Sequence, residues 1–191
     1  MLTKEQFHDL LAKKGRLILD GATGSNLQKM GMPRGCCSEE WILANPDKLV
    51  ALQRQYVASG SDIIYAPTFQ AQPIALERVC LDKQTEAINA HLVALCKSVS
   101  PDVLVAGNLT TLAAFCDSWD PDNFDLLVEN YRRQIRGLID GGADLLEDPG
   151  ISESGSADHQ AVSPGPFQAA QRCLRRYDVA VCNYRYRQLR L

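Results

Sequence analysis

The sequence predicts an α/β fold with a parallel β-sheet, because short apolar segments alternate with longer helical patterns at a steady interval. The apolar segments are 16–20, 61–69, 102–109 and 143–147. Their apolar residues are consecutive rather than alternating, which is typical of strands buried on both faces of a parallel sheet. The segments begin about 41 to 45 residues apart, so each interval has room for a helix, as in βαβ units. An open doubly wound sheet and a (β/α) barrel both fit this order.

Helical patterns occupy the three intervals between these segments. Asn45-Pro46 predicts a capped helix start and Gly60 predicts its end. A second helix is predicted over 83–98, and a third begins at Asp120-Pro121 and ends at Gly141-Gly142. Each has apolar residues at helical spacing, which indicates one face packed on a core.

Composition excludes several classes of protein. The chain has 191 residues, of which 46% are hydrophobic and 23% charged, as in a folded domain. Its net charge of −3 argues against a nucleic-acid-binding protein. No stretch approaches the ~18 apolar residues of a membrane-spanning helix, and the N-terminal residues lack the pattern of a signal peptide. Seven cysteines without an export signal favour free thiols and a cytoplasmic location.

Polar residues follow each predicted strand. Asp20, Thr68, Asn108 and Glu147 stand at the four carboxyl ends, where parallel α/β folds carry their active sites. Such a set could hold an amino group and a carboxylate, or Asp20 and Glu147 could form an acid/base pair. Equally, Asp20 and Asn108 could only cap or turn the chain. The turn after Asp20 has no GxGxxG pattern and the chain has no GxxxxGK[ST] loop, so nothing indicates nucleotide binding.

Cys36-Cys37 is the one pair of residues that suggests a metal site. No third ligand stands at a telling spacing, and the three histidines (His8, His91 and His159) are scattered. The sequence therefore predicts loop thiols here and no metal ligands.

Three stretches together resemble the homocysteine S-methyltransferase family, including the homocysteine-binding domain of cobalamin-dependent methionine synthase. They are LDGATGSNLQKMGMPRG (19–35), Glu-Trp-Ile-Leu (40–43) and NPDKLVALQRQYVASGSDIIYAPTF (45–69). Gly107-Asn108-Leu109-Thr110 is similar to the family's Gly-Asp-(Ile/Leu) segment, with Asn in place of Asp. The resemblance covers about residues 15–146.

The resemblance implies a (β/α)8 TIM barrel, of which this chain would hold about the first four βα units. It implies a zinc ion that binds the homocysteine sulfur as thiolate, which then attacks a methyl group on methylcobalamin or another donor carried by a separate protein. It also implies that Asp20 and Gly21 line the substrate pocket, with Thr68, Phe69 and Asn108 nearby. Glu147 would hold the substrate amino group.

The chain departs from the family in its zinc ligands and in its tail. The family's ligands are a cysteine after the sixth strand and a Gly-Gly-Cys-Cys pair after the eighth, and Gly35-Cys36-Cys37 stands after the first predicted strand instead. We therefore expect negligible turnover by this chain alone. Residues 148–191 fit nothing in the family and carry arginines but no lysine. A frameshift, or a real accessory segment with a helix over 166–176 and a strand over 178–184, would explain them.

Half a barrel would leave sheet edges open and an apolar face exposed. An alternative function is therefore a non-catalytic half-barrel that binds a partner chain, such as a second half-barrel. The other expected partners are homocysteine or a related thiol and a corrinoid protein, with no nucleic acid and no membrane.

Overall fold

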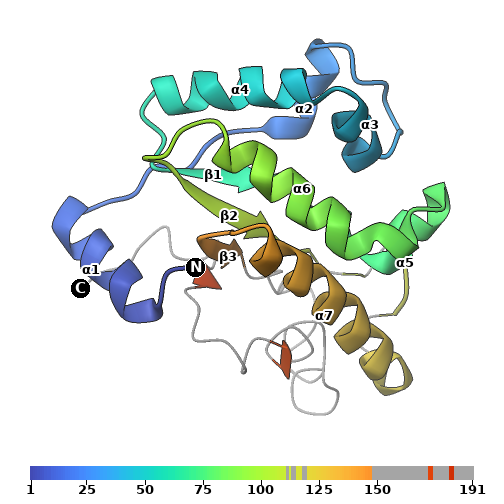
Figure 1. Ribbon diagram of the computed structural model, residues 1–191. Coiled ribbons are helices and arrows are strands. Elements are labelled where there is room, and N and C mark those ends of the chain that lie inside the picture. Colours follow the sequence, from blue (N-terminus) through green and yellow to red (C-terminus); the bar gives the residue numbers. More distant parts are fainter. Residues whose placement is uncertain (111, 113–114, 118–119, 148–171, 174–180, 183–191) are drawn as a thin grey trace.

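The computed structural model describes residues 1–110, 112, 115–117, 120–147, 172–173 and 181–182. Their elements form a small parallel sheet with helices packed against it (Figure 1). The α-helices are α1 (Lys4–Lys14), α2 (Thr23–Lys29), α3 (Ser38–Ala44), α4 (Pro46–Ala58), α5 (Pro73–Leu76), α6 (Thr85–Lys97) and α7 (Phe124–Asp140). The 3-10 turns are η1 (Glu77–Val79), η2 (Asp82–Gln84) and η3 (Pro121–Asn123). The strands are β1 (Ile63–Ala66), β2 (Leu104–Asn108), β3 (Leu145–Glu147) and β4 (Val181–Cys182).

The strands lie in the order β1-β2-β3-β4, and all neighbours are parallel. This confirms the predicted α/β class with a parallel sheet. The predicted strand over 16–20 is wrong in extent, because it contributes a single bridge between Leu19 and Ile63. Residues 18 and 20 still make hydrogen bonds to residues 62, 63 and 65, and the chain then enters α2 at Thr23. Of the tail, β4 lies inside the predicted strand 178–184, and the predicted helix over 166–176 lies almost wholly outside the described residues.

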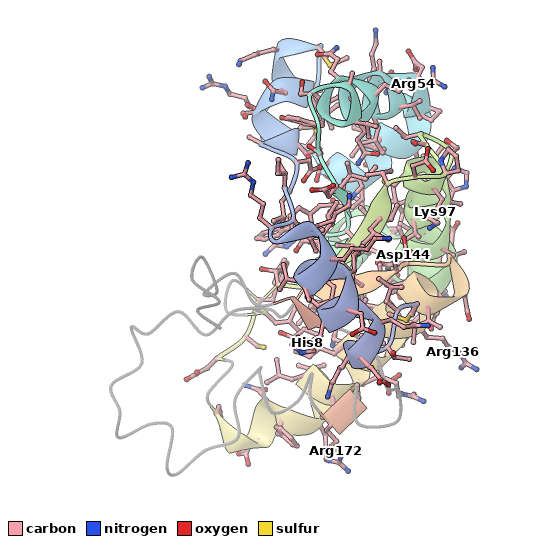
Figure 2. The ribbon with its side chains drawn as sticks, turned by 90° about the vertical axis from the view of Figure 1, so that its left-hand side faces the viewer. His8, Arg54, Lys97, Arg136, Asp144 and Arg172 are labelled. Carbon is pink, nitrogen blue, oxygen red and sulfur yellow. The ribbon has the colours of Figure 1, made fainter. Side chains whose placement is uncertain are left out.

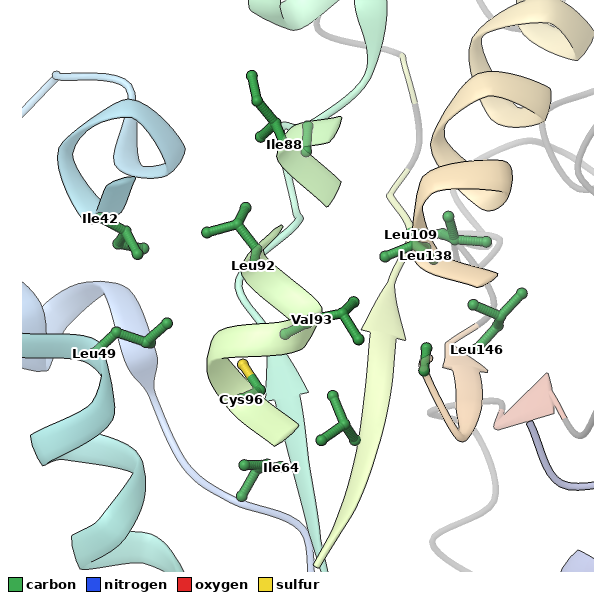
Figure 3. Packing of buried hydrophobic residues seen from close by; sticks show 14 of the residues in the cluster. Ile42, Leu49, Ile64, Ile88, Leu92, Val93, Cys96, Leu109, Leu138 and Leu146 are labelled. Carbon is green, nitrogen blue, oxygen red and sulfur yellow. The ribbon is translucent and has the colours of Figure 1, made fainter. Parts of the chain in front are cut away.

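Both faces of the sheet are buried, as the consecutive apolar residues predict. On one face, Ile64 and Leu146 join the main core with side chains from α4, α6 and α7 (Figure 3). On the other face, Ile63 and Leu145 form a smaller cluster against Phe7 of α1. The three helices that cover the first face are those that the sequence predicts between the strands.

The three predicted helices are confirmed, with local differences at the starts of two: the third opens with the 3-10 turn η3 before α7 begins at Phe124, and the other difference is at Asn45. Helix α4 begins at Pro46 as predicted, but the Asn45 side chain makes no capping bond and instead donates to the Trp41 carbonyl at 2.9 Å. The reason is that α3 ends at Ala44, so Asn45 closes the preceding helix. The sequence patterns do not indicate α2, α3 or α5, each of which is seven residues or shorter.

Two aspartates fix the amino-terminal ends of the strands. Asp144, before β3, accepts from the Val105 N–H at 2.8 Å and pairs with Lys97 at 2.7 Å (Figure 2). Asp62, before β1, accepts from the Ile18 N–H at 2.9 Å and pairs with Lys14, whose hydrogen bond lowers the pKa of Asp62. These bonds tie α1 and α6 to the amino end of the sheet.

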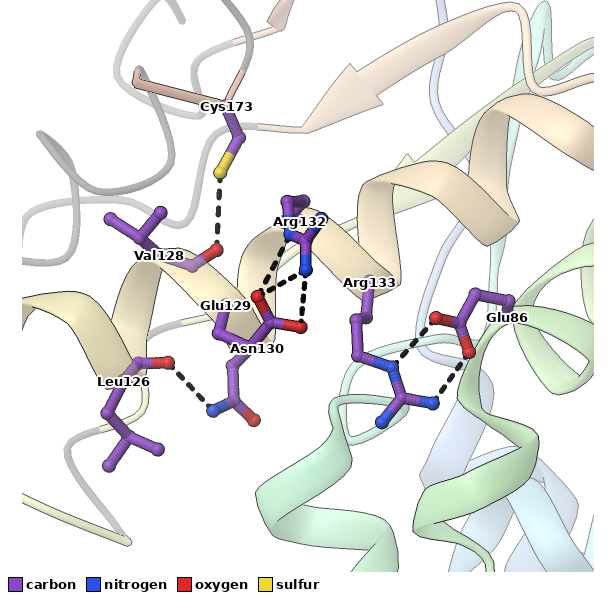
Figure 4. A network of polar contacts seen from close by, with 8 residues as sticks. All are labelled: Glu86, Leu126, Val128, Glu129, Asn130, Arg132, Arg133 and Cys173. Carbon is purple, nitrogen blue, oxygen red and sulfur yellow. Dashed lines mark hydrogen bonds and ion pairs between the residues drawn. The ribbon is translucent and has the colours of Figure 1, made fainter.

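Helices α6 and α7 pack closely along their length. Glu86 of α6 and Arg133 of α7 form a two-bond ion pair, with both N–O distances at 2.7 Å (Figure 4). Gly137 and Gly141 let the two backbones meet, because a Cβ at Gly137 would lie 2.5 Å from the Glu86 carbonyl oxygen. No helix among the described residues is long and apolar enough to cross a membrane.

Candidate functional site

The carboxyl ends of the strands bring several predicted site residues to one edge of the sheet. Asn108 is the last residue of β2 and lies opposite Glu147, the last residue of β3, in the strand register. Thr68 follows β1 by two residues, and Asp20 follows the bridge to β1 by one. Because the strands are parallel, these four residues share the end at which α/β proteins bind their ligands.

Asp20 is bound to β1 through both backbone and side chain. Its N–H donates to the Ile63 carbonyl at 2.9 Å, and its Oδ2 accepts from the Tyr65 N–H at 3.1 Å. The second bond joins residues 45 positions apart, so it is not the local cap or turn that the sequence left open. The other carboxyl oxygen, Oδ1, is buried and has no hydrogen-bond partner among the described residues.

Burial raises the pKa of Asp20 to about 6, although the Tyr65 N–H acts in the opposite direction. Desolvation penalises the ionised carboxylate, and an approaching cation would reverse that penalty. A raised pKa caused by burial, at the end of the sheet where ligands bind, makes Asp20 a candidate site residue for a positively charged group.

Thr68 and Asn108 join the ends of β1 and β2. The Thr68 hydroxyl donates to the Asn108 carbonyl at 2.9 Å and accepts from the Asn108 N–H at 3.1 Å. The side-chain amide of Gln134 in α7 donates to the Thr68 carbonyl at 2.7 Å. The Thr68 side chain is fully buried, so its chemistry is used in holding these two strand ends in register.

Two side chains at this edge remain open to a ligand. The amide of Asn108 is partly buried and makes no hydrogen bond to a described residue, and the Phe69 side chain is 52% exposed. Of Glu147, the structure describes the backbone position at the end of β3. An amide donor and an aromatic face at the same end of the sheet as Asp20 are groups that suit a small amino acid.

The turn after Asp20 depends on Tyr56, a residue that the sequence patterns assign to the core stripe of α4. The Tyr56 hydroxyl donates to the Ala22 carbonyl at 2.9 Å and accepts from the Asn26 side chain at 2.8 Å. A Cβ on Gly21 would lie 3.0 Å from the Tyr56 ring. Gly21 is therefore needed for the close approach of this ring.

The described residues do not form a site that fits a zinc ion. No three or more His, Cys, Asp and Glu side chains among them are arranged to hold a metal ion. The Cys36 thiol donates to the Pro33 carbonyl at 3.1 Å. Burial raises the pKa of Cys37, and the neighbouring Glu39 carboxyl raises it further, whereas a zinc ligand must be a thiolate.

Comparison with known proteins agrees with this fold. Three crystal structures of homocysteine methyltransferase MmuM from Escherichia coli are similar to the chain: the metallated form (22% identity, TM-score 0.70), the oxidised form (22%, 0.69) and the apo form (23%, 0.60). Each comparison covers 91% of this chain, but only 64%, 63% and 60% of the respective MmuM chains. The chain thus spans less than two thirds of the length of that enzyme.

The sequence itself matches a family model. The model describes homocysteine S-methyltransferase and matches residues 17–147. That range contains α2 to α7 and β1 to β3, together with all six residues that the sequence assigns to the substrate pocket. The match spans most of the chain, and the protein therefore belongs to the homocysteine S-methyltransferase family.

Proposed function

We propose that the carboxyl edge of the sheet binds homocysteine as the acceptor of a methyl group. The observation that carries this proposal is the buried Oδ1 of Asp20, which has no hydrogen-bond partner among the described residues, in a chain that belongs to the homocysteine S-methyltransferase family. Homocysteine carries an ammonium group that would complete the hydrogen bonding of this oxygen. Its binding would also stabilise the ionised form of Asp20.

Of the other site residues, some would contact the substrate and one would hold the backbone of the site in place. Asn108 would donate its side-chain amide to the substrate carboxylate, and Phe69 would pack against the aliphatic part of the substrate. Glu147 would also hold the ammonium group, as the family resemblance implies, from its position beside Asn108 in the strand register. Thr68 would act through the backbone that it holds, since its hydroxyl is already bonded to Asn108.

The proposed reaction forms a bond between the homocysteine sulfur and a methyl carbon, breaks the bond from that carbon to its donor, and releases the thiol proton. The proposal includes a (β/α)8 barrel that begins with the strands described here. It also includes zinc and a donor such as methylcobalamin on a separate protein. Since the described residues do not fit zinc, its ligands would come from elsewhere, and we assign no step to it here. The product would be methionine.

Homocysteine binding is expected to depend on pH through Asp20. Its raised pKa of about 6 means that the carboxyl group is ionised at pH 7.5 and mostly protonated at pH 5. We therefore expect the dissociation constant for L-homocysteine, measured by isothermal titration calorimetry, to rise roughly tenfold from pH 7.5 to pH 5. A thiol without the amino group, 4-mercaptobutyrate, is the matched control, whose weaker binding should change little with pH. Equal binding of both thiols at pH 7.5 would contradict the proposal.

The alternative function, a half-barrel that binds a partner chain, is favoured by one observation. Both bonds to Ile63 come from the neighbours of Leu19, namely the Ile18 carbonyl and the Asp20 N–H. The N–H and carbonyl of Leu19 therefore face the opposite side, as a free edge does. The side chains of Ile18 and Leu19 are 49% and 40% exposed there. A second chain could add a strand at this edge.

This edge is expected to drive association. Sedimentation velocity of the whole chain between about 1 and 100 μM should show dimers or larger species, since exposed strand edges and apolar patches pair readily. Leu19→Lys should shift the distribution to monomer, whereas Leu126→Lys, at another exposed leucine (42%) on α7, should not. A monomer at all concentrations, with a single cooperative melt, would exclude this alternative.

A further inference from the structure

The segment that follows β1 is held by buried polar side chains from several helices. We define the β1 loop as residues 67–72, which include Thr68 and Phe69. Four buried amides donate to backbone carbonyls of this loop or of Tyr65 in β1; three of them come from α4, α6 and α7, and the fourth belongs to the loop itself. They are Gln53 to Tyr65 (2.9 Å), Gln134 to Thr68 (2.7 Å), Gln72 to Phe69 (3.1 Å) and Asn89 to Ala71 (2.8 Å).

Glu39 of α3 makes the complementary bond. Its Oε1 accepts from the Gln70 N–H at 2.8 Å, and its Oε2 accepts from the Ser38 hydroxyl at 2.8 Å. The carboxyl group is 1% exposed and forms no ion pair with a Lys, Arg or His among the described residues. A buried carboxyl group is costly unless it is hydrogen-bonded, and here both oxygens are bonded, one of them to the β1 loop.

The loop that results is unusual in combining a fixed backbone with an exposed aromatic side chain. The carbonyls of Thr68, Phe69 and Ala71 and the N–H of Gln70 are all bonded to buried groups. Yet the Phe69 side chain remains 52% exposed. Exposed loops are ordinarily mobile. A side chain on an immobilised backbone binds a ligand with a smaller loss of conformational entropy.

We propose that Glu39 is a positioning residue for the substrate site. It acts through the Gln70 N–H, which it binds at the point where the β1 loop turns from the site toward α5. Without this bond the four amides still hold the loop carbonyls, but the Phe69–Gln70 peptide loses the bond to its N–H and keeps only the Gln72 bond to its carbonyl. That this site binds a substrate rests on the proposed function. That Glu39 positions the loop rests on the hydrogen bonds alone.

The test measures loop order and ligand binding in the same variants. Amide hydrogen exchange, followed by mass spectrometry, reports on peptides that cover 66–72, and calorimetry reports on L-homocysteine. Glu39→Ala removes both acceptors, while Glu39→Gln keeps an oxygen for the Gln70 N–H. Glu40→Gln is the control at an exposed neighbouring position, and Leu127→Ala is a control for general destabilisation, because Leu127 is fully buried in the core.

For Glu39→Ala we expect exchange in 66–72 to rise roughly tenfold, with α6 and α7 unchanged, and homocysteine affinity to fall roughly tenfold. Glu39→Gln should restore both to within about threefold of the wild type, and Glu40→Gln should match the wild type. If Glu39→Ala does not fold, Glu39→Asp, which is one methylene shorter, decides the matter with the same readouts.

Two results would overturn the inference. One is unchanged exchange in 66–72 when Glu39 is replaced. The other is a rise of exchange throughout the chain, as expected for Leu127→Ala, which would make Glu39 a general stabilising residue. If the wild type binds no homocysteine, the proposed function fails, and the exchange pattern alone still decides whether Glu39 positions the loop.

Discussion

Asp20→Asn is expected to weaken homocysteine binding strongly and, at the same time, to stabilise the free protein. Loss of the charged partner of the ammonium group should cost about 2–3 kcal/mol of binding free energy, which is roughly 30- to 150-fold in affinity at pH 7.5. The measurement is calorimetry with L-homocysteine. Asp9→Asn, at an exposed acid in α1, is the matched control and should bind as the wild type does.

The gain in stability has a defined pH range. The pKa of Asp20 is raised from 3.8 to about 6 in the folded protein, so the folded state binds this proton more tightly than the unfolded state does. Protonated Asp20 therefore favours folding below pH 4, and that contribution is lost as the pH rises through about 6. Asparagine avoids the buried charge, so Asp20→Asn should raise the free energy of unfolding by about 1 kcal/mol at pH 7.5.

The gain should disappear below pH 4, as measured by urea denaturation across the pH range. The full pKa shift would correspond to more than this, but Asp20 is only partly buried, and solvent screens part of the penalty. A variant that binds homocysteine normally, or one that is less stable than the wild type at pH 7.5, would contradict the role assigned to Asp20.

Gly137→Ala is expected to have the largest effect on stability. The added Cβ would lie 2.5 Å from the Glu86 carbonyl oxygen and 2.9 Å from its Cα. Backbone atoms of a packed helix cannot move aside cheaply, so α6 and α7 must separate. We expect a loss of about 3 kcal/mol or more in the free energy of unfolding, measured by chemical denaturation followed by circular dichroism.

Gly24→Ala is the matched control for this substitution. Gly24 lies in α2, and a Cβ there would meet no atom within 4 Å. Because alanine favours helix more than glycine does, this variant should be stabilised by about 0.5–1 kcal/mol. Equal stability of Gly137→Ala and the wild type would show that the two helices are less closely packed than the structure indicates.

Much of the fold could be predicted from the sequence, because burial leaves a direct mark on it. Consecutive apolar residues predict strands with two buried faces, and 63–66 and 104–108 are such strands. The stripes of α4, α6 and α7 likewise predict the three covering helices. The short helices α2 and α3 could not be predicted in this way, because seven residues give two turns and no repeated pattern.

Part of the site could also be predicted. Asp20, Thr68, Asn108 and Glu147 follow apolar runs, and their place at the carboxyl ends of strands could be inferred from the parallel order. The different roles of these four residues could not be predicted. Nothing in the sequence distinguishes Thr68, whose hydroxyl is used in the bonds to Asn108, from Asn108, whose side-chain amide makes no hydrogen bond to a described residue.

The sequence does contain a sign of the side chains that support the site. Gln53, Asn89 and Gln134 interrupt the apolar stripes of α4, α6 and α7. A buried amide on a core stripe needs a hydrogen-bond partner, and here each partner is a carbonyl at the end of β1 or in the β1 loop. The carbonyl that each amide binds can be as many as 66 positions away along the chain. The sequence therefore shows that each amide needs a hydrogen-bond partner but does not show which group that partner is.

The sequence by itself determined the α/β class, the parallel sheet, the three main helices and the family, since these depend on local burial patterns and on motifs that are contiguous in the chain. The tertiary structure decided that 16–20 is an exposed edge with one bridge, that one oxygen of Asp20 is buried without a partner, and that Glu39 holds the Gln70 N–H. Each of these depends on which distant groups surround an atom, because desolvation and hydrogen bonding act over a few ångströms in space, whatever the separation along the chain.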